Sequence, residues 1–174
     1  EQDWLDDYAL FMALKDKFGG RPWTDWDEDI KLRQPEAMKR WQEELKDEIK
    51  FQKFVQYIFY RQWDRFHRYC NKNGIQLIGD IPIYVSPDCA DVWAQPELFE
   101  LDEKRVPKRV AGVPPDYFSA TGQLWGNPLY NWDAMRADGY RWWMQRIAAA
   151  GRLFDVIRID HFRGLESYWS VPYG

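Results

Sequence analysis

The clearest structural signal in this chain is Phe154-Asp155-Val156-Ile157-Arg158-Ile159-Asp160-His161-Phe162-Arg163-Gly164. Here an apolar strand pattern ends in a cation and a carboxylate two residues apart. Successive strand residues point to opposite faces, so the even-numbered residues, Arg158 and Asp160 among them, share one face. In an α/β barrel that face would look into the barrel, and Asp160 would lie at the carboxyl-terminal mouth, where such barrels carry their active sites. A nucleophilic carboxylate would be placed there.

The length of the chain fits part of such a barrel. Its 174 residues are enough for one ordinary domain, whereas a complete (β/α)8 barrel typically needs about 250 residues. We therefore interpret residues 1–174 as a partial catalytic barrel domain, truncated before the later strands. The chain begins with Glu1 rather than Met, and it has no signal-peptide pattern and no apolar run near the roughly 20 residues of a membrane span. We expect a cytoplasmic protein with no membrane partner.

The charge pattern argues against nucleic acid as a partner. The net charge is -4, from 24 basic and 28 acidic residues that are interspersed without a sustained basic block. A neutral or small substrate is more compatible with this balance. The cysteines, Cys70 and Cys89, show no CxxC or His-rich spacing, so the sequence predicts neither a disulfide framework nor a metal site. We expect no cofactor.

Aromatic residues are frequent: 11 Trp, 10 Tyr and 10 Phe make up 18% of the chain. Their stiff apolar faces, with polar tips on Tyr and Trp, suit the C–H faces and hydroxyl rims of sugar rings. The alternative is that they pack in the core, which aromatic side chains commonly dominate. We assign roughly two-thirds of them to packing.

Hydrophobic spacing predicts helices and strands in alternation, which is the rhythm of a parallel α/β sheet. The predicted elements are a helix over 6–18 that stops at Gly19-Gly20, a helix from Pro35 to Asn73-Gly74, a strand over 75–85, a helix from Asp133 to Gly151 and the strand over 154–160. Pro82 cannot donate a ladder hydrogen bond, so the first strand should end there. The Pro- and Gly-rich stretch 86–132 is expected to be a long binding loop or lid.

Arg158 and Asp160 permit two interpretations. A guanidinium on the same strand face can keep a carboxylate ionised, and an ionised Asp is a competent nucleophile toward an anomeric carbon. Alternatively, the two residues form a structural ion pair that plugs a barrel end. His161 has the opposite parity, so a wall residue is favoured over a metal ligand or proton carrier. For Arg163, contact with a loop is favoured over contact with a ligand.

Asp80 occupies the matching place near the end of the earlier strand, four residues before Tyr84. Its carboxylate either orients a substrate hydroxyl or pairs with Arg158 across the barrel mouth.

The loop over 110–128 combines rigid turns with aromatic side chains. Pro and Gly fix its path, so Tyr117, Phe118 and Trp125 would be presented rather than buried. The alternative is an aromatic cluster that anchors the loop to its own domain.

Three motifs occur together in this chain: Gly79-Asp80-Ile81-Pro82-Ile83-Tyr84-Val85, the loop over 112–128 and Ile157-Arg158-Ile159-Asp160-His161-Phe162-Arg163-Gly164. In this order they resemble the 4-α-glucanotransferase family, also called amylomaltase or disproportionating enzyme. The likeness runs through most of the chain. It implies a TIM barrel with long inserted loops and a helical subdomain, related to the α-amylases. It also implies α-1,4-glucan and maltooligosaccharide donors and acceptors, with no cofactor.

The resemblance assigns roles by position. Asp160 corresponds to the catalytic nucleophile and Arg158 to the arginine that accompanies it, while Tyr117 and Phe118 match aromatics of a loop that shapes the sugar-binding groove. The implied substrate-binding residues are Asp80, Tyr84, Tyr117, Phe118, Trp125, Asn127 and His161.

The implied reaction is retaining. Asp160 attacks the anomeric carbon, a covalent glucosyl-enzyme forms, and a sugar hydroxyl rather than water completes the transfer. In the family, the acid/base Glu and a further Asp lie downstream of the nucleophile, and Glu166 follows Asp160 too closely to match the acid/base. We expect the chain to lack that carboxylate and to be inactive alone. Two alternatives are a non-catalytic α-glucan-binding module and an α-glucan hydrolase of the related α-amylase group.

Overall fold

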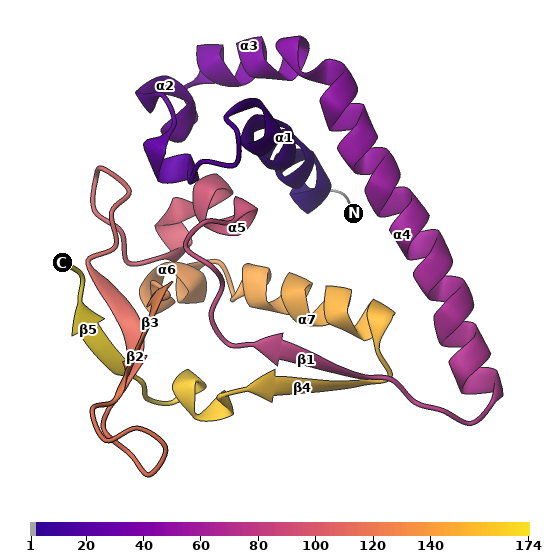
Figure 1. Ribbon diagram of the computed structural model, residues 1–174, viewed down its shortest axis with the longest axis vertical. Coiled ribbons are helices and arrows are strands. Elements are labelled where there is room, and N and C mark those ends of the chain that lie inside the picture. The colour runs from indigo at the N-terminus through magenta and orange to yellow at the C-terminus, as the bar shows by residue number, and fades with distance from the viewer. Residues whose placement is uncertain (1–2) are drawn as a thin grey trace.

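The computed structural model describes residues 3–174 (Figure 1). The α-helices are α1 (Asp3–Lys17), α2 (Glu28–Lys31), α3 (Pro35–Glu44), α4 (Lys46–Lys72), α5 (Ala90–Ala94), α6 (Trp132–Ala137) and α7 (Arg141–Leu153). Short 3-10 turns are η1 (Trp23–Asp25), η2 (Pro96–Leu98) and η3 (Phe162–Leu165). The strands are β1 (Ile78–Pro82), β2 (Arg109–Val113), β3 (Gln123–Pro128), β4 (Val156–Asp160) and β5 (Trp169–Pro172).

The two predicted strands, β1 and β4, pair in parallel, as the alternation of helices and strands indicated. Asp80 lies opposite Arg158 in the ladder, and Pro82 lies opposite Asp160. β1 ends at Pro82 as predicted, although it begins at Ile78 rather than at residue 75. Both strands run toward the same end of the molecule (Figure 1), so their carboxyl-terminal residues meet there.

The two faces of the β1–β4 pair differ in burial. On one face Gly79 and Ile81 are buried, while Ile157 and Ile159 are half-buried. Helix α7 lies along the pair (Figure 1) and contacts both strands. The opposite face holds the even-numbered residues of β1 and β4, and all of them are exposed. The charged residues predicted to face a barrel interior therefore lie on the open face of the pair.

Residues 86–132 are not the irregular loop that the sequence suggested. They contain α5, η2 and the antiparallel β2–β3 hairpin, and β5 pairs with the other edge of β2 to give the order β3-β2-β5. The prediction was wrong because these strands lack a regular alternation: the pairing register shifts between Val110 and Gly112, and Gly126 has a φ of 78°. This sheet lies beyond the carboxyl ends of β1 and β4 (Figure 1).

Two of the predicted helices are each divided into two. The helix expected over 35–74 breaks at Leu45, a buried residue between α3 and α4. The helix expected over 133–151 breaks between α6 and α7, where Gly139 (φ 72°) and Tyr140 (φ 58°) adopt left-handed conformations. Helix α7 then runs past Gly151 to Leu153. Apolar spacing continues through both breaks, so the hydrophobic pattern could not reveal them.

Many of the aromatic residues form the core. Trp23, Trp93 and Tyr130 are each 1% exposed, and Trp93 meets the rings of Phe11 and Trp26. In contrast, α4 exposes much of its aromatic surface. Within residues 3–174, no helix is both long enough and apolar enough to cross a membrane.

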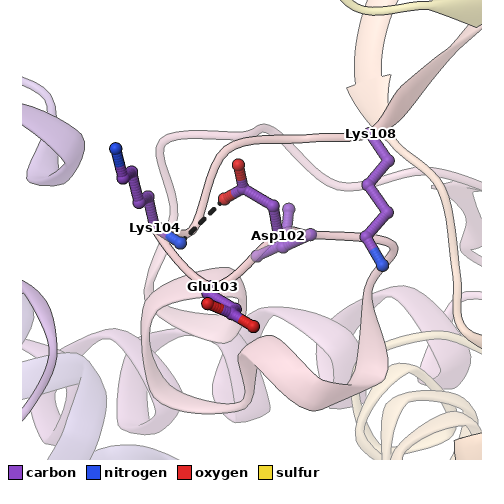
Figure 2. A pocket seen from close by; sticks show the side chains of 5 residues that line it. Asp102, Glu103, Lys104 and Lys108 are labelled. Carbon is purple, nitrogen blue, oxygen red and sulfur yellow. Dashed lines mark hydrogen bonds between the residues drawn. The ribbon is translucent and has the colours of Figure 1, made fainter.

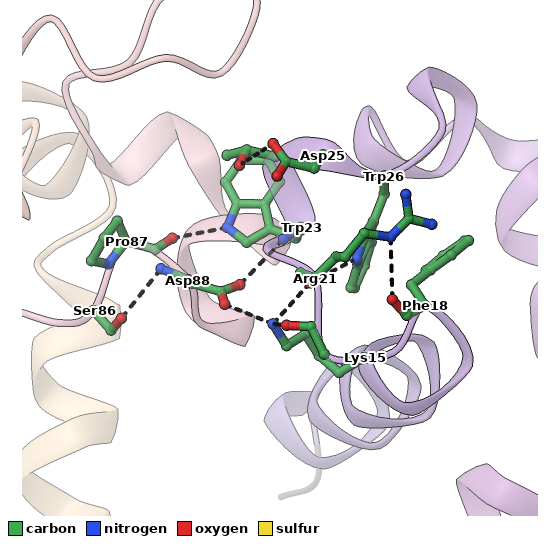
Figure 3. A network of polar contacts seen from close by, with 11 residues as sticks. Lys15, Phe18, Arg21, Trp23, Asp25, Trp26, Ser86, Pro87 and Asp88 are labelled. Carbon is green, nitrogen blue, oxygen red and sulfur yellow. Dashed lines mark hydrogen bonds and ion pairs between the residues drawn. The ribbon is translucent and has the colours of Figure 1, made fainter. Parts of the chain in front are cut away.

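A polar network joins α1 and η1 to the segment that follows β1 (Figure 3). Asp88 is its centre: Oδ2 lies 2.7 Å from Nζ of Lys15, and Oδ1 accepts the backbone N–H of Trp23 at 3.2 Å. The Trp23 indole N–H donates to the carbonyl of Pro87 at 2.8 Å. The helical part of the chain therefore fixes the path taken just after β1.

Candidate active site

Arg158 connects the two strands at their carboxyl-terminal ends. Its Nε donates to Oδ1 of Asp80 at 3.0 Å, and its Nη2 lies 2.8 Å from Oδ2 of the same carboxylate. The same Nη2 also donates to Oδ1 of Asp160 at 3.4 Å. Of the two sequence-based options for Asp80, pairing with Arg158 is confirmed, because both carboxylate oxygens face the guanidinium.

The charges of this group stay in contact with solvent. The side chains of Arg158 and Asp160 are each 64% exposed, and that of Asp80 is 52% exposed. The pKa of Arg158 is raised above its usual value, first by its hydrogen bond to Asp80, then by the charge of Asp80 and, least, by that of Asp160. Oδ2 of Asp160 has no hydrogen-bond partner among residues 3–174, which leaves this oxygen available to a ligand.

The tip of the β2–β3 hairpin presents two aromatic rings to solvent. Tyr117 is 97% exposed and Phe118 is 88% exposed, and their rings meet edge to face with centroids 5.7 Å apart. Oδ1 of Asp116 accepts the backbone N–H groups of Phe118 (2.9 Å) and Ser119 (2.8 Å), and the Ser119 hydroxyl donates to the carbonyl of Gly122 at 2.7 Å. The prediction of presented rings is confirmed for Tyr117 and Phe118. The third ring of that prediction, Trp125, is 39% exposed and contacts Tyr84 and His161, so it anchors the loop as the alternative stated.

Trp125 and His161 bring the hairpin next to the end of β4. Their rings meet edge to face with centroids 5.0 Å apart. His161 has a φ of 52°, a left-handed conformation that turns the chain directly after Asp160. The indole N–H of Trp125 donates to the side chain of Gln123 at 3.0 Å. His161 therefore lies just outside β4, and its position follows from this turn and from the contact with Trp125 rather than from strand parity.

Tyr84 and Asn127 lie behind this surface. Tyr84 is only 5% exposed and contacts the rings of Trp125, Tyr130 and Tyr168. Burial raises the pKa of Tyr84 to about 12, so the phenol is neutral, and its hydroxyl has no hydrogen-bond partner in the described part of the chain. The Asn127 amide donates to the carbonyl of Val85 at 2.8 Å. Tyr84 is therefore buried against Trp125, and Asn127 links the hairpin to the segment that follows β1.

A cavity of ≈ 410 Å³ has His161 in its lining. It is formed by the loop end of the β2–β3 hairpin and by the connection from β4 to β5. Its polar and aromatic lining consists of Asp116, His161, Arg163, Ser167, Tyr168 and Trp169.

A second hollow, of ≈ 580 Å³, is lined by Leu101, Asp102, Glu103, Lys104 and Lys108 (Figure 2). Asp102 holds the turn by accepting the backbone N–H of Lys104 at 2.8 Å. The lysine side chains extend on opposite sides of the turn (Figure 2), so they do not converge on one point. This hollow is the surface of an open turn, and its lining includes neither Arg158 nor Asp160.

Comparison with known proteins decides the family. Residues 1–174 match the family model described as 4-alpha-glucanotransferase. The chain belongs to the 4-alpha-glucanotransferase family. The 4-alpha-glucanotransferase of Aquifex aeolicus is 53% identical over 171 residues, which are 98% of this chain and 35% of that protein. The enzyme of that name from Thermus thermophilus is 50% identical over 169 residues, which are 97% of this chain and 34% of its own length.

A solved structure supports the same assignment. The amylomaltase from Streptococcus agalactiae, in complex with acarbose, matches with a TM-score of 0.95 and 45% identity over 99% of this chain and 36% of that chain. The resemblance inferred from the three motifs is thereby confirmed. This 4-alpha-glucanotransferase family chain spans about a third of the length of these relatives.

Sequence reasoning missed the residues that hold this family member's site in shape. Asp116 was read only as part of a Pro- and Gly-rich loop, yet its carboxylate fixes the hairpin tip. An Asp side chain that accepts the backbone N–H groups two and three residues later is a known turn motif. This signal could have been recognised in the sequence. Trp169, which lines the cavity, gave no signal, because its position depends on β5 pairing with β2 across a long stretch of chain.

Proposed function

We propose that this chain is part of the catalytic (β/α)8 barrel of a 4-α-glucanotransferase, that residues 1–174 belong to one barrel domain, and that Asp160 is its nucleophile. Family membership supports the activity. The parallel β1–β4 pair, covered by α7 on one face and open on the other, is what two neighbouring strands of such a barrel would present. The barrel interior would then be the face that carries Asp80, Arg158 and Asp160.

The observation that carries this proposal is the position of Asp160. It ends a parallel strand, one oxygen accepts from Arg158, and the other has no partner within the described residues 3–174. In the proposed first step, a free electron pair of Asp160 forms a bond to the anomeric carbon, while the glycosidic oxygen leaves and takes a proton from a general acid. In the second step, an acceptor sugar hydroxyl gives its proton back to the group that acted as the acid, and its oxygen displaces the Asp160 carboxylate from that carbon. One α-1,4 bond is broken and one is formed.

Arg158 and Asp80 are proposed to position the nucleophile. The two contacts from Asp80 fix the direction of the guanidinium, and the guanidinium then restrains the near oxygen of Asp160. A preorganised cation of this kind would keep the carboxylate oriented toward the substrate. The ion pair that links β1 to β4 would thus also be the one that positions the nucleophile.

The hairpin is proposed to form one wall of the glucan groove. Tyr117 and Phe118 offer two exposed rings, and Trp125 stands beside His161 at the end of β4. Such rings can stack on the C–H faces of sugars while hydroxyls reach polar groups at the rim. Tyr84 and Asn127 would act by supporting Trp125 and the hairpin, since both lie beneath that wall.

A retaining mechanism needs a second carboxyl group about 5–5.5 Å from the nucleophile. Asp80 is an unsuitable acid/base, because both of its oxygens face the guanidinium of Arg158. We therefore propose that the acid/base group lies outside these 174 residues and that this chain alone does not catalyse transfer.

Maltotriose disproportionation by the full-length protein tests the proposed function. The expected products are glucose and longer maltooligosaccharides, and a glucosyl adduct on the peptide containing Asp160 should be trapped by mass spectrometry. Asp160→Asn should abolish both, while Asp133→Asn, on the exposed surface of α6, should change neither. Steady release of reducing sugar would indicate hydrolysis instead. Transfer by the 174-residue chain alone would show that no essential carboxylate is missing.

A further inference from the structure

Arg146 of α7 holds the backbone at the point where β1 ends. Its Nη2 donates to the carbonyl of Pro82 at 2.6 Å, and its Nη1 donates to the carbonyl of Ile83 at 3.2 Å. The same Nη1 also donates to the hydroxyl of Tyr130 at 3.3 Å. One guanidinium therefore binds two consecutive carbonyls, because its N–H groups form a planar fork.

The guanidinium of Arg146 is itself held against its own helix. It lies over the rings of Trp142 and Trp143, with its central carbon 5.2 Å from each ring centroid. Both indoles are 6% exposed, and the Trp142 N–H donates to Oδ1 of Asp91 at 2.9 Å. A cation over aromatic rings that are largely shielded from water is attracted to them more strongly than at an exposed site. Arg146 is therefore placed to restrain the backbone that it binds.

The oxygen atoms that Arg146 binds are neutral. Two are backbone carbonyls, and the third is the hydroxyl of Tyr130, a residue that is 1% exposed. Burial raises the pKa of Tyr130 above its ordinary value, although the charge of Arg146 acts in the opposite direction. The phenol therefore keeps its proton and donates it to the carbonyl of Ile83 at 2.6 Å. Because a charged donor makes stronger hydrogen bonds than a neutral one, the hold on these carbonyls is firm.

The restrained carbonyls lie next to the charged group of the candidate site. Pro82 is opposite Asp160 in the parallel ladder, and Asp80, two residues earlier, binds Nε and Nη2 of Arg158. Helix α7 lies along one face of the β1–β4 pair (Figure 1), whereas these charged side chains stand on the open face. Arg146 therefore reaches them through the backbone of β1.

We propose that Arg146 is a positioning residue for glucosyl transfer. By holding the carbonyls of Pro82 and Ile83 it fixes the end of β1, and with it the carboxylate of Asp80 that orients Arg158 beside the nucleophile. The role in transfer rests on the proposed function, whereas the hold on β1 rests on the contacts of Arg146 themselves. A misplacement of about 1 Å can cost about 10²-fold in rate. Loosening the end of β1 should therefore lower kcat and leave substrate binding nearly unchanged.

The test compares variants of the full-length protein by kcat and KM for maltotriose, measured separately. Arg146→Met keeps a long side chain but removes every N–H donor, and Arg146→Lys replaces the planar fork by a single ammonium group. We expect kcat to fall about tenfold in Arg146→Met and about threefold in Arg146→Lys, with KM within about twofold of the native value. Arg141→Gln removes an arginine of the same helix that is 73% exposed and pairs with Asp138, and it should change neither constant.

A double variant separates positioning from a general loss of stability. In Asp80→Asn the anchor of Arg158 is already lost, so adding Arg146→Met should lower kcat further by less than about twofold. A merely structural Arg146 would instead multiply the two losses, because independent effects add in free energy. Urea midpoints of the same samples establish that each variant is folded under the assay conditions.

Two results would overturn the positioning role: an unchanged kcat in Arg146→Met, or losses that multiply in the double variant. Where Arg146→Met does not fold, Arg146→Lys takes its place in both comparisons, because it retains a cation over the tryptophan rings, and an unchanged kcat in it is equally contrary. Absence of transfer in the native full-length protein would reject the proposed function, and the positioning role with it. Normal native transfer together with an unaltered kcat in both Arg146 variants would reject the positioning role alone.

Discussion

Arg158 binds Asp80 more closely than it binds Asp160. Its contacts to the two oxygens of Asp80 are 3.0 and 2.8 Å, against 3.4 Å to Asp160. The cause is the register of the parallel pair, which sets Arg158 directly opposite Asp80, while Asp160 lies two residues further along the same strand. The guanidinium is therefore oriented by Asp80 on the neighbouring strand. Asp160 makes only the longer contact with it.

Asp80→Asn should impair transfer much more than stability. The amide cannot accept two charge-assisted hydrogen bonds, so Arg158 is no longer held in place. Asp160 then loses the fixed guanidinium beside it. We expect kcat for maltotriose in the full-length protein to fall on the order of 10²-fold, and the free energy of unfolding to fall by less than about 1 kcal/mol because the pair is exposed. Asp64→Asn removes another exposed Arg–Asp pair, on α4, and should leave kcat unchanged. An undiminished kcat in Asp80→Asn would remove Asp80 from the mechanism.

Gly79→Ala and Gly151→Ala should have opposite effects on stability. A methyl group at Gly79 would overlap the ring of Phe154, so we expect a loss of about 1–3 kcal/mol. Gly151 lies within α7, and its added methyl would meet only Cδ1 of Ile157, at 3.9 Å. There we expect a gain of about 0.5–1 kcal/mol, because Ala is the better helix former. Urea unfolding of the two variants beside the native chain measures both effects, and equal midpoints would contradict the packing around β1.

The parts of the fold that follow from local sequence were predictable. The β1–β4 pair was found because period-2 apolar residues end in charged ones, and the stop after α1 was found because Gly19 and Gly20 supply left-handed conformations, with φ of 66° and 78°. The β3-β2-β5 sheet was not, because β2 and β3 are rich in Gly and Pro and β5 pairs across a long stretch of chain. Likewise, residue types alone could not separate Tyr117, which is exposed, from Tyr84, which is buried.

Asp88→Asn should destabilise the chain, because its carboxylate joins α1 and η1 to the segment after β1 (Figure 3). The side chain of Lys15 is only 16% exposed, so its charge would lose its partner in a partly dehydrated place. We expect a loss of about 1–3 kcal/mol in urea unfolding. Asp47→Asn breaks an exposed pair with Lys50 on α4 and should cost less than about 0.5 kcal/mol. Comparable losses in the two variants would contradict the special role of Asp88.

Asp155 should make the stability of the chain depend on acidity. Its pKa is lowered to about 2, first by the backbone N–H of Leu77, then by the amide of Asn71 and by His67, whose Nε2 lies 3.0 Å away. The folded pKa lies below the ordinary value of 3.8, so the stabilising contribution is fully present above about pH 4 and is lost as the pH falls through 2. The urea midpoint of Asp155→Asn should therefore lie below that of the native chain at pH 7, and the gap should close between pH 4 and 2.

The matched control for this pH series is Asp133→Asn. The Asp133 side chain is 93% exposed and lies far along the chain from β4, so the midpoint of this variant should follow that of the native chain at every pH. A gap for Asp155→Asn that stays constant from pH 7 to 2 would mean that the carboxylate acts by shape and not by charge. A gap that closes only in this variant would show that the ionised Asp155 fastens the end of α4 to the start of β4, because its hydrogen bonds to Asn71 and Leu77 need the charged acceptor.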